Sequence, residues 1–285
     1  MTRDPSHHAL CFDLHTHTTA SDGQLAPAEL VRKALAIGLS ALAVTDHDTM
    51  SGIEEALSEA AGHDLEVIPG VEISTDIASE EVHILGYYVD HQAPALRRQL
   101  ALLRESRRER ARKIVARLTQ MGLALSWERT CEYAHGPSVG RPHIAQAMVQ
   151  AGHVATVDEA FRRYIGRRGP AYVERFKLPT REAVQAILSA GGIPVLAHPL
   201  YATHHVPNLA AQGIAGLEVY YSGYTETDCE ALNALASRFG LIATGGSDFH
   251  GESVLPGHDL GSVAIPAIVI EQLHAYRAAL RSRLS

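Results

Sequence analysis

Histidine and carboxylate residues follow most of the short β-rich runs in this sequence. Three clear cases are the segments DLHTH at 13–17, TDHD at 45–48 and GSDFH at 246–250. In a parallel α/β barrel the carboxyl ends of the strands meet on one face, so residues more than two hundred positions apart converge there. The chain is therefore constrained to a fold that gathers these side chains at one mouth.

The strand candidates are short apolar or alternating runs that end in polar residues. They are 10–14, 41–45, 65–68, 82–89, 193–197, 216–220 and 241–244. Helical stretches separate most of them, and the first begins near Pro27 and ends at Gly38. This alternation predicts an α/β fold with a parallel sheet of about seven strands, close to the eight of a (β/α) barrel.

Residues 96–179 interrupt that alternation with helical sequence. A long helix carries leucines 96, 100, 103 and 118 on one face and stops near Gly122, and shorter helices begin at Arg141 and at Thr156. We expect a barrel domain from 10–95 and 180–285, with 96–179 as a mostly helical insertion that covers the substrate pocket.

The net charge of −7 conceals a strong asymmetry. Residues 96–181 hold 18 of the 25 basic and 7 of the 32 acidic residues, which gives +11 there against −18 elsewhere. An acidic body suits cation binding, and a basic insert suits an anionic substrate brought to those cations.

Several classes of protein are disfavoured by composition. No apolar run approaches the roughly 20 residues of a membrane helix, and residues 1–9 lack the basic-then-apolar pattern of a secretory signal. Cys11, Cys131 and Cys229 lie far apart without a CxxC pair, which argues against disulfides and thiolate zinc sites. We expect a cytoplasmic protein with no membrane association, and no protein partner is indicated.

The strand-end side chains are the donors that divalent cations use. In a strand, residues two apart point to the same side, so His15 and His17 can bind one ion together. The full set of candidate ligands is His15, His17, Asp22, His47, Glu72, His83, His198, Asp248 and His250. Nine donors exceed the four to six of one ion, so two or three metals are predicted, with Glu72 as the candidate bridge. Nitrogen and oxygen donors without sulfur favour manganese, iron or zinc.

The motifs at 13–18, 45–48, 69–72, 197–199 and 246–250 resemble those of the PHP (polymerase and histidinol phosphatase) domain phosphoesterases, which are related to the amidohydrolases. The resemblance implies a distorted (β/α)7 barrel with three metals, Mn2+ first among them and Fe2+ or Zn2+ as alternatives. It assigns the ligands in three groups: His15, His17, Glu72 and Asp248; Glu72, His83 and His198; and Asp22, His47 and His250.

The helical insert and its stretch GRPHIA at 140–145 resemble the group that hydrolyses nucleoside 3′,5′-bisphosphates and acts on short RNA 5′ ends. Arg141 and His143 would then contact substrate phosphate, although helix capping is an equal alternative for His143. Lys177 and Tyr201 are further candidates for this pocket because they flank strand motifs. The arginine-rich face over 97–117 is interpreted as a solvated helix surface, with direct binding of single-stranded RNA as the alternative.

The predicted function is removal of the 3′-phosphate from a nucleoside 3′,5′-bisphosphate such as 3′-phosphoadenosine 5′-phosphate, with trimming of short RNA 5′ ends as an added activity. A metal-bridging hydroxide would attack phosphorus, with Glu72, Asp248 and Arg141 as catalytic residues. Three alternatives stay open: a histidinol-phosphate or other small phosphomonoester phosphatase, a carbon-nitrogen amidohydrolase, and a non-catalytic PHP module. Amidohydrolase sites commonly bridge their metals with a modified lysine, and Glu72 stands in that place here.

Overall fold

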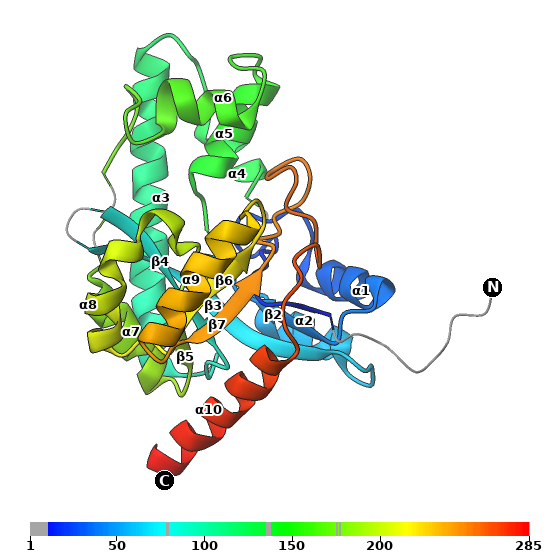
Figure 1. The fold of residues 1–285 in the computed structure, drawn as a ribbon. Coiled ribbons are helices and arrows are strands. Elements are labelled where there is room, and N and C mark those ends of the chain that lie inside the picture. Colours follow the sequence, from blue (N-terminus) through cyan, green and yellow to red (C-terminus); the bar gives the residue numbers. More distant parts are fainter. Residues whose placement is uncertain (1–10, 78–79, 135–137, 175, 177, 285) are drawn as a thin grey trace.

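A seven-stranded sheet forms the centre of the molecule in the computed structural model, which describes residues 11–77, 80–134, 138–174, 176 and 178–284 (Figure 1). Its strands follow one another in sequence order around the sheet. They are β1 Phe12–Asp13, β2 Ala41–Val44, β3 Glu66–Ile77, β4 Glu80–Tyr87, β5 Ile193–Leu196, β6 Gly216–Tyr221 and β7 Ile242–Gly246. Side chains such as Ile68, Leu85 and Val195 fill the interior and are fully buried.

The sheet curls until its two edges nearly meet. Beyond β1 and β7, Thr16 forms an isolated parallel bridge with Phe249. The backbone N–H of His17 donates to the carbonyl of Phe249 at 2.9 Å, and the N–H of Phe249 donates to the carbonyl of His15 at 3.3 Å. The expectation of a seven-stranded, barrel-like α/β fold is confirmed.

The expectation of an all-parallel sheet is wrong for one strand. β4 is antiparallel to both of its neighbours, β3 and β5. Only two residues separate Ile77 from Glu80 in the sequence, which is far too short for the crossover that a parallel pair needs. β3 also continues well beyond the predicted 65–68, so that Glu72 lies inside the strand rather than after it.

Helices cover the outside of the barrel (Figure 1). They are α1 Pro27–Ile37, α2 Ile53–Ala60, α7 Thr180–Ser189, α8 Val206–Gln212, α9 Glu226–Arg238 and α10 Ile268–Leu284, with 3₁₀ turns η2 Pro199–Tyr201 and η3 Thr203–His205. α1 has the predicted signals: Pro27 occupies its first turn, and Gly38 ends it in the left-handed conformation with φ 80°. None of the helices in the described residues is long and apolar enough to span a membrane.

The insert stands on α3 Pro94–Gln120, a long helix that belongs to two hydrophobic cores. Near its start Leu96, Leu100 and Leu103 pack with the barrel, whereas Ile114 and Leu118 pack within the insert. The remaining helices of the insert are α4 Trp127–Glu132, α5 Arg141–Gln150, α6 Val157–Ala160 and the π-helical turn η1 Phe161–Ile165. The predicted Thr156 is the N-cap of α6, and its hydroxyl accepts the N–H of Glu159 at 3.1 Å. α3 therefore fixes the insert above the mouth of the barrel.

Candidate metal centre

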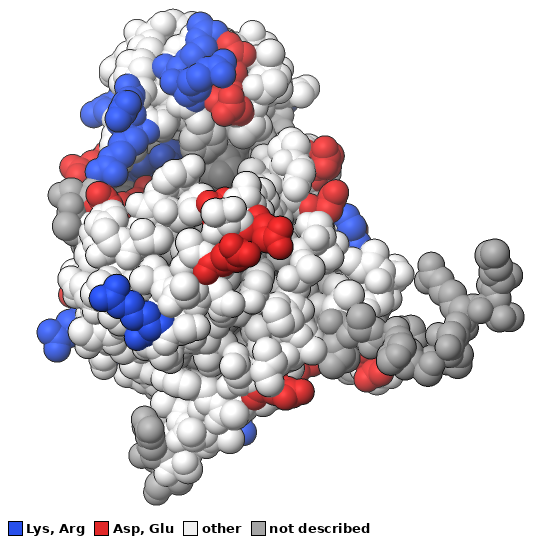
Figure 2. All heavy atoms as spheres, in the orientation of Figure 1, with Lys and Arg blue, Asp and Glu red and all other residues white. Residues whose placement is uncertain are grey.

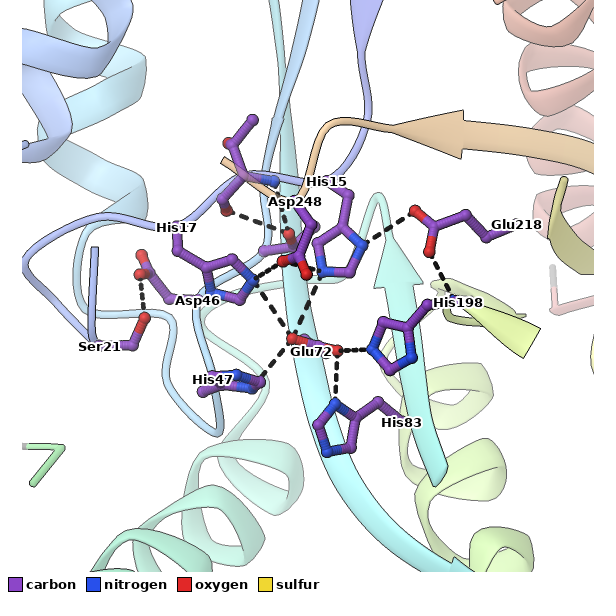
Figure 3. A network of polar contacts seen from close by, with 12 residues as sticks. His15, His17, Ser21, Asp46, His47, Glu72, His83, His198, Glu218 and Asp248 are labelled. Carbon is purple, nitrogen blue, oxygen red and sulfur yellow. Dashed lines mark hydrogen bonds and ion pairs between the residues drawn. The ribbon is translucent and has the colours of Figure 1, made fainter. Parts of the chain in front are cut away.

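The fold brings the nine predicted donors to one mouth of the barrel, and Figure 3 shows all of them except Asp22 and His250. They come from six of the seven strands or from the loops that follow them, with Asp22 between β1 and α1. His15 and His17 lie just beyond the two-residue β1, where the bridge at Thr16 keeps the backbone paired with Phe249. Segments separated by more than two hundred residues are thus adjacent.

Glu72 lies at the centre of this cluster, and its two carboxylate oxygens face different imidazoles. Oε1 lies 2.7 Å from Nδ1 of His83 and 3.2 Å from Nε2 of His198. Oε2 faces three further rings: Nδ1 of His47 at 2.9 Å, Nε2 of His17 at 3.3 Å and Nε2 of His15 at 3.4 Å. A carboxylate shared in this way between two groups of nitrogens has the geometry of a bridging ligand.

Two further carboxylates complete the donor groups. Oδ1 of Asp248 lies 3.2 Å from Nε2 of His15 and 3.1 Å from Nε2 of His17. Oδ1 of Asp22 lies 3.4 Å from Nε2 of His250 and 3.8 Å from Nδ1 of His17. The four residues His15, His17, Glu72 and Asp248 are all buried, so little water reaches their donor atoms.

Many of these buried atoms converge without forming hydrogen bonds. Nε2 of His15, both ring nitrogens of His17, Nδ1 of His47, Oδ1 of Asp22 and Oε2 of Glu72 are buried and lack a hydrogen-bond partner. Leaving a buried polar atom unsatisfied costs about 1–3 kcal/mol. Lone pairs directed at shared points are satisfied by cations, and the nitrogen and oxygen donors suit a divalent metal. The residues therefore fit the predicted metals.

The electrostatics of the cluster also favour cations. Burial opposes charge on His17, but the nearby carboxylates of Asp248 and Glu72 raise its pKa to about 10. Burial likewise opposes charge on His83, yet Glu72 raises its pKa to about 9. Burial would raise the pKa of Glu72, but the surrounding histidines hold it well below its usual range. The carboxylates remain ionised and attract positive charge to the mouth.

A buried carboxylate that sequence reasoning missed holds two of the histidines from behind. Oε1 of Glu218 lies 2.9 Å from Nδ1 of His15, and its Oε2 accepts the backbone N–H of His198 at 2.6 Å. A carboxylate only accepts, so Nδ1 of His15 is the donor and Nε2 is left to face the cluster. The available signal was a lone acid inside the otherwise apolar and aromatic strand β6.

Asp13 and Asp46 also end strands, but they hold loops in place (Figure 3 shows Asp46 bonded to Ser21). Asp46 accepts the backbone N–H of Thr18 at 2.8 Å and its hydroxyl at 2.7 Å. Asp13 accepts the backbone N–H of Ser247 at 2.9 Å. These bonds fix the loops that present the candidate ligands.

Unusual backbone conformations concentrate at this mouth. Asp48, His198 and Asp248 have positive φ values of 54°, 29° and 55°, which non-glycine residues adopt rarely and at a cost. A Cβ on Gly246 would lie 2.4 Å from the backbone nitrogen of His15, so only glycine permits the close approach of these segments. The rest of the fold holds the site in a strained arrangement.

The predicted substrate-binding residues do not all come together. Arg141 begins α5 and faces the barrel, with its Nη2 3.7 Å from Oε2 of Glu81. His143 is buried, and its Nδ1 accepts the backbone N–H of Gly140 at 3.0 Å, which is the capping alternative. The side chain of Tyr201 is 90% exposed in η2. Lys177 lies outside the described residues.

The interpretation of the arginine-rich face of α3 as wholly solvated is wrong for one stripe. Arg104, Arg107 and Arg110 are spaced three apart; the first two bond to the barrel, and Arg110 bonds within the insert. Nη1 of Arg104 donates to the carbonyl of Asp48 at 3.1 Å, and Nη2 of Arg107 donates to Oδ2 of the same residue at 2.7 Å. Nε of Arg110 donates to the carbonyl of Val173 at 2.7 Å. Composition alone could not separate these arginines from their exposed neighbours.

A cavity of about 110 Å³ separates the metal-competent cluster from this stripe. His47 and His83 line it on the barrel side, and Arg107, Arg110 and Arg141 line it on the insert side. Figure 2 shows Lys and Arg side chains gathered over the insert above the barrel. The cavity thus joins cation-binding donors to fixed positive charge.

Comparison with known proteins matches residues 13–164 to the PHP domain. The 5′-3′ exoribonuclease Rnm of Salmonella typhimurium is 37% identical over 254 residues, covering 86% of this chain and 87% of that protein. The 3′,5′-nucleoside bisphosphate phosphatase of Chromobacterium violaceum is 35% identical over 260 residues, covering 88% and 90%. The solved structure of an amidohydrolase from Chromobacterium violaceum, with bound sulfate, has a TM-score of 0.85 at 33% identity and covers 93% of this chain and 96% of that one. The similarity extends over barrel and insert alike.

Proposed function

This chain belongs to the PHP domain family and is a metal-dependent phosphoesterase, and we propose that it removes the 3′-phosphate from nucleoside 3′,5′-bisphosphates. The observation that carries this proposal is the cavity with candidate metal ligands on one wall and three arginines on the other. One phosphate of the substrate lies at the ligands, and the second lies on the guanidinium groups. A relative that covers most of this chain is named for that activity.

Arg110 gives the strongest support for a second phosphate-binding position in the cavity. Arg110 is only 8% exposed, and its Nη2 is buried without a hydrogen-bond partner in the described part of the chain. Burial and the neighbouring charge of Arg141 lower the pKa of Arg110 to about 10, although Glu81 partly opposes this. A buried guanidinium with an unused donor is stabilised by a phosphate, which can accept two of its N–H groups.

The proposed ligand groups are those that the resemblance implies. Donor atoms of the first and third groups converge, whereas the second is supported by Oε1 of Glu72, which faces both His83 and His198. The first group is His15, His17, Glu72 and Asp248; the second is Glu72, His83 and His198; the third is Asp22, His47 and His250. Divalent cations held by these residues would supply Lewis-acid chemistry, polarising phosphoryl oxygens and activating a water molecule. Mn2+ is the proposed metal.

The chain's own residues orient the reaction. Glu72 and Asp248 fix the histidine rings, and Tyr221 donates its hydroxyl proton to Oδ2 of Asp248 at 2.7 Å, which holds that carboxylate in one orientation. Arg141 reaches the cavity from the insert and stabilises charge that develops on the phosphoryl group. Water adds to phosphorus as the bond to the ribose 3′-oxygen breaks, one proton of that water ends on the 3′-oxygen, and the nucleoside 5′-phosphate and inorganic phosphate leave.

A decisive experiment compares two substrates that differ only in the second phosphate. We expect Mn2+-loaded protein to hydrolyse 3′-phosphoadenosine 5′-phosphate with kcat/KM about 10- to 100-fold above that for adenosine 3′-phosphate, because one charged contact contributes about 1.5–3 kcal/mol. Phosphate release is the readout. Equal values for the two substrates, or faster turnover of histidinol phosphate, would overturn the proposal in favour of a general phosphomonoesterase.

The same assay tests the ribonuclease alternative, since one relative is a 5′-3′ exoribonuclease. Short 5′-phosphorylated oligoribonucleotides replace the bisphosphate, and product length is followed by gel electrophoresis. Stepwise release of nucleotides at a higher kcat/KM than the bisphosphate would reassign the principal substrate to RNA. The proposal requires the bisphosphate to be the better substrate.

A further inference from the structure

A second group of histidine and carboxylate donors shares no residue with the central cluster. Glu80 is the first residue of β4, and His204 and His205 are the last two residues of η3. Nε2 of His204 lies 3.1 Å, and Nε2 of His205 lies 2.9 Å, from the same oxygen, Oε2 of Glu80. One donor atom from each of the three residues lies within 4.8 Å of the other two, as in the groups of the central cluster.

The two imidazoles converge although their positions favour divergence. Successive residues of a 3₁₀ helix project about 120° apart, because the helix has three residues per turn. Here the rings of His204 and His205 are 4.0 Å apart between centroids, and both direct Nε2 at Glu80. Two imidazoles and one carboxylate meeting at a point are the donor set of a three-residue site for zinc and similar cations.

The exposure of these side chains suits an exchangeable ion. The side chain of His205 is 11% exposed, whereas those of Glu80 and His204 are 50% and 57% exposed. Solvent can therefore supply the fourth ligand of a four-coordinate ion, as it does in open zinc sites. By contrast, the central cluster is mostly buried.

From this convergence we infer that Glu80, His204 and His205 form a peripheral site for a divalent cation of the zinc type, separate from the proposed catalytic metals. An ion at this position also connects two segments of the structure. Glu80 lies three residues before His83, and η3 follows closely after His198. A cation there links the two segments that carry the partners of Oε1 of Glu72, and it stabilises their relative position.

The test counts Zn2+ ions in protein whose central cluster lacks its bridging carboxylate. Chelator-treated full-length Glu72→Gln protein is titrated with Zn2+ by calorimetry, and Co2+ absorption reports tetrahedral coordination. We expect the number of Zn2+ ions bound per chain to fall by one when His204→Ala or Glu80→Gln is added. Circular dichroism verifies that each variant is folded, and His204 is exposed enough for alanine to be tolerated.

The matched control is His63→Ala, which removes another exposed histidine from the same background. That variant must retain the ion. Equal Zn2+ binding by Glu72→Gln with and without His204→Ala and Glu80→Gln would overturn the inference. Bisphosphate hydrolysis by the His204→Ala protein is measured separately, so failure of the proposed function leaves the ion count interpretable, and the reverse also holds.

Discussion

The two walls of the central cavity carry different kinds of side chain. The barrel wall presents histidines and carboxylates that are buried and held from behind, as Glu218 holds His15. The insert wall presents guanidinium groups from one face of α3 and from the start of α5. The first arrangement suits cations and bond cleavage, whereas the second suits recognition of a substrate charge. Within one cavity, the barrel wall thus serves bond cleavage and the insert wall serves substrate specificity.

One ion pair joins the two walls directly. Arg107 of the insert donates to Asp48 of the barrel at 2.7 Å and to Oγ of Ser74 at 2.8 Å. Asp48 is buried and adopts a left-handed backbone conformation, so its side chain is placed by the loop after β2. The insert is therefore positioned by the same strand end that supplies His47.

The largest effect is expected at the centre of the barrel wall. Glu72→Gln keeps the side-chain volume but removes the charge that five histidines face, and we expect kcat to fall by about 10³-fold or more for every phosphate ester. Metal analysis should show loss of bound Mn2+ in parallel. Glu230→Gln on the exposed face of α9 is the matched control. Near-normal turnover by Glu72→Gln would disprove the assignment of chemistry to this wall.

The next largest effect is expected on stability at the junction. Arg107→Met leaves Asp48 buried without its cation, and we expect the free energy of unfolding to fall by about 3 kcal/mol. Adding Asp48→Asn removes the isolated charge and should restore part of that loss. Urea denaturation of the single and double variants measures the coupling. If the two effects simply add to within about 0.5 kcal/mol, the ion pair does not join the walls.

Much of the barrel wall could be predicted because its donors follow recognisable strands. His47 and Asp248 follow the ends of β2 and β7 within three residues, and parallel strands place such residues at one edge. The antiparallel β4 was not foreseen, because periodicity reports which residues alternate and not which way a strand runs. The positive φ of His198 was also beyond reach, since tertiary packing imposes it.

The insert wall was much harder to predict from sequence. α3 contains many arginines, and helical spacing alone does not show which of them face another domain. Arg107 and Arg110 are distinguished by the packing of α3 across both hydrophobic cores, which is a long-range property. Glu218 was detectable in principle, because an acid inside an apolar strand must find a partner when buried.

A moderate effect is expected at Arg110, and it should depend on the substrate. Arg110→Met removes the buried donor that lacks a partner, and we expect KM for the bisphosphate to rise about 10- to 100-fold while kcat for adenosine 3′-phosphate stays nearly unchanged. Steady-state phosphate release measures both. Arg129→Met, at an exposed arginine of α4, is the control. Equal losses for both substrates would show that the insert wall contributes to the chemical step itself.

The smallest effect is expected behind the barrel wall, at Glu218. Glu218→Gln retains an acceptor for the N–H of His198 but weakens the charge-assisted bond that orients His15, so Glu218 acts as a positioning residue. We expect Mn2+ affinity to fall about 10-fold and kcat at saturating Mn2+ to recover most of its value. Titration of activity against Mn2+ concentration separates affinity from turnover. If excess Mn2+ does not restore kcat, Glu218 acts in the reaction itself rather than through His15. The barrel wall would then include Glu218 as well as the donors that line the cavity.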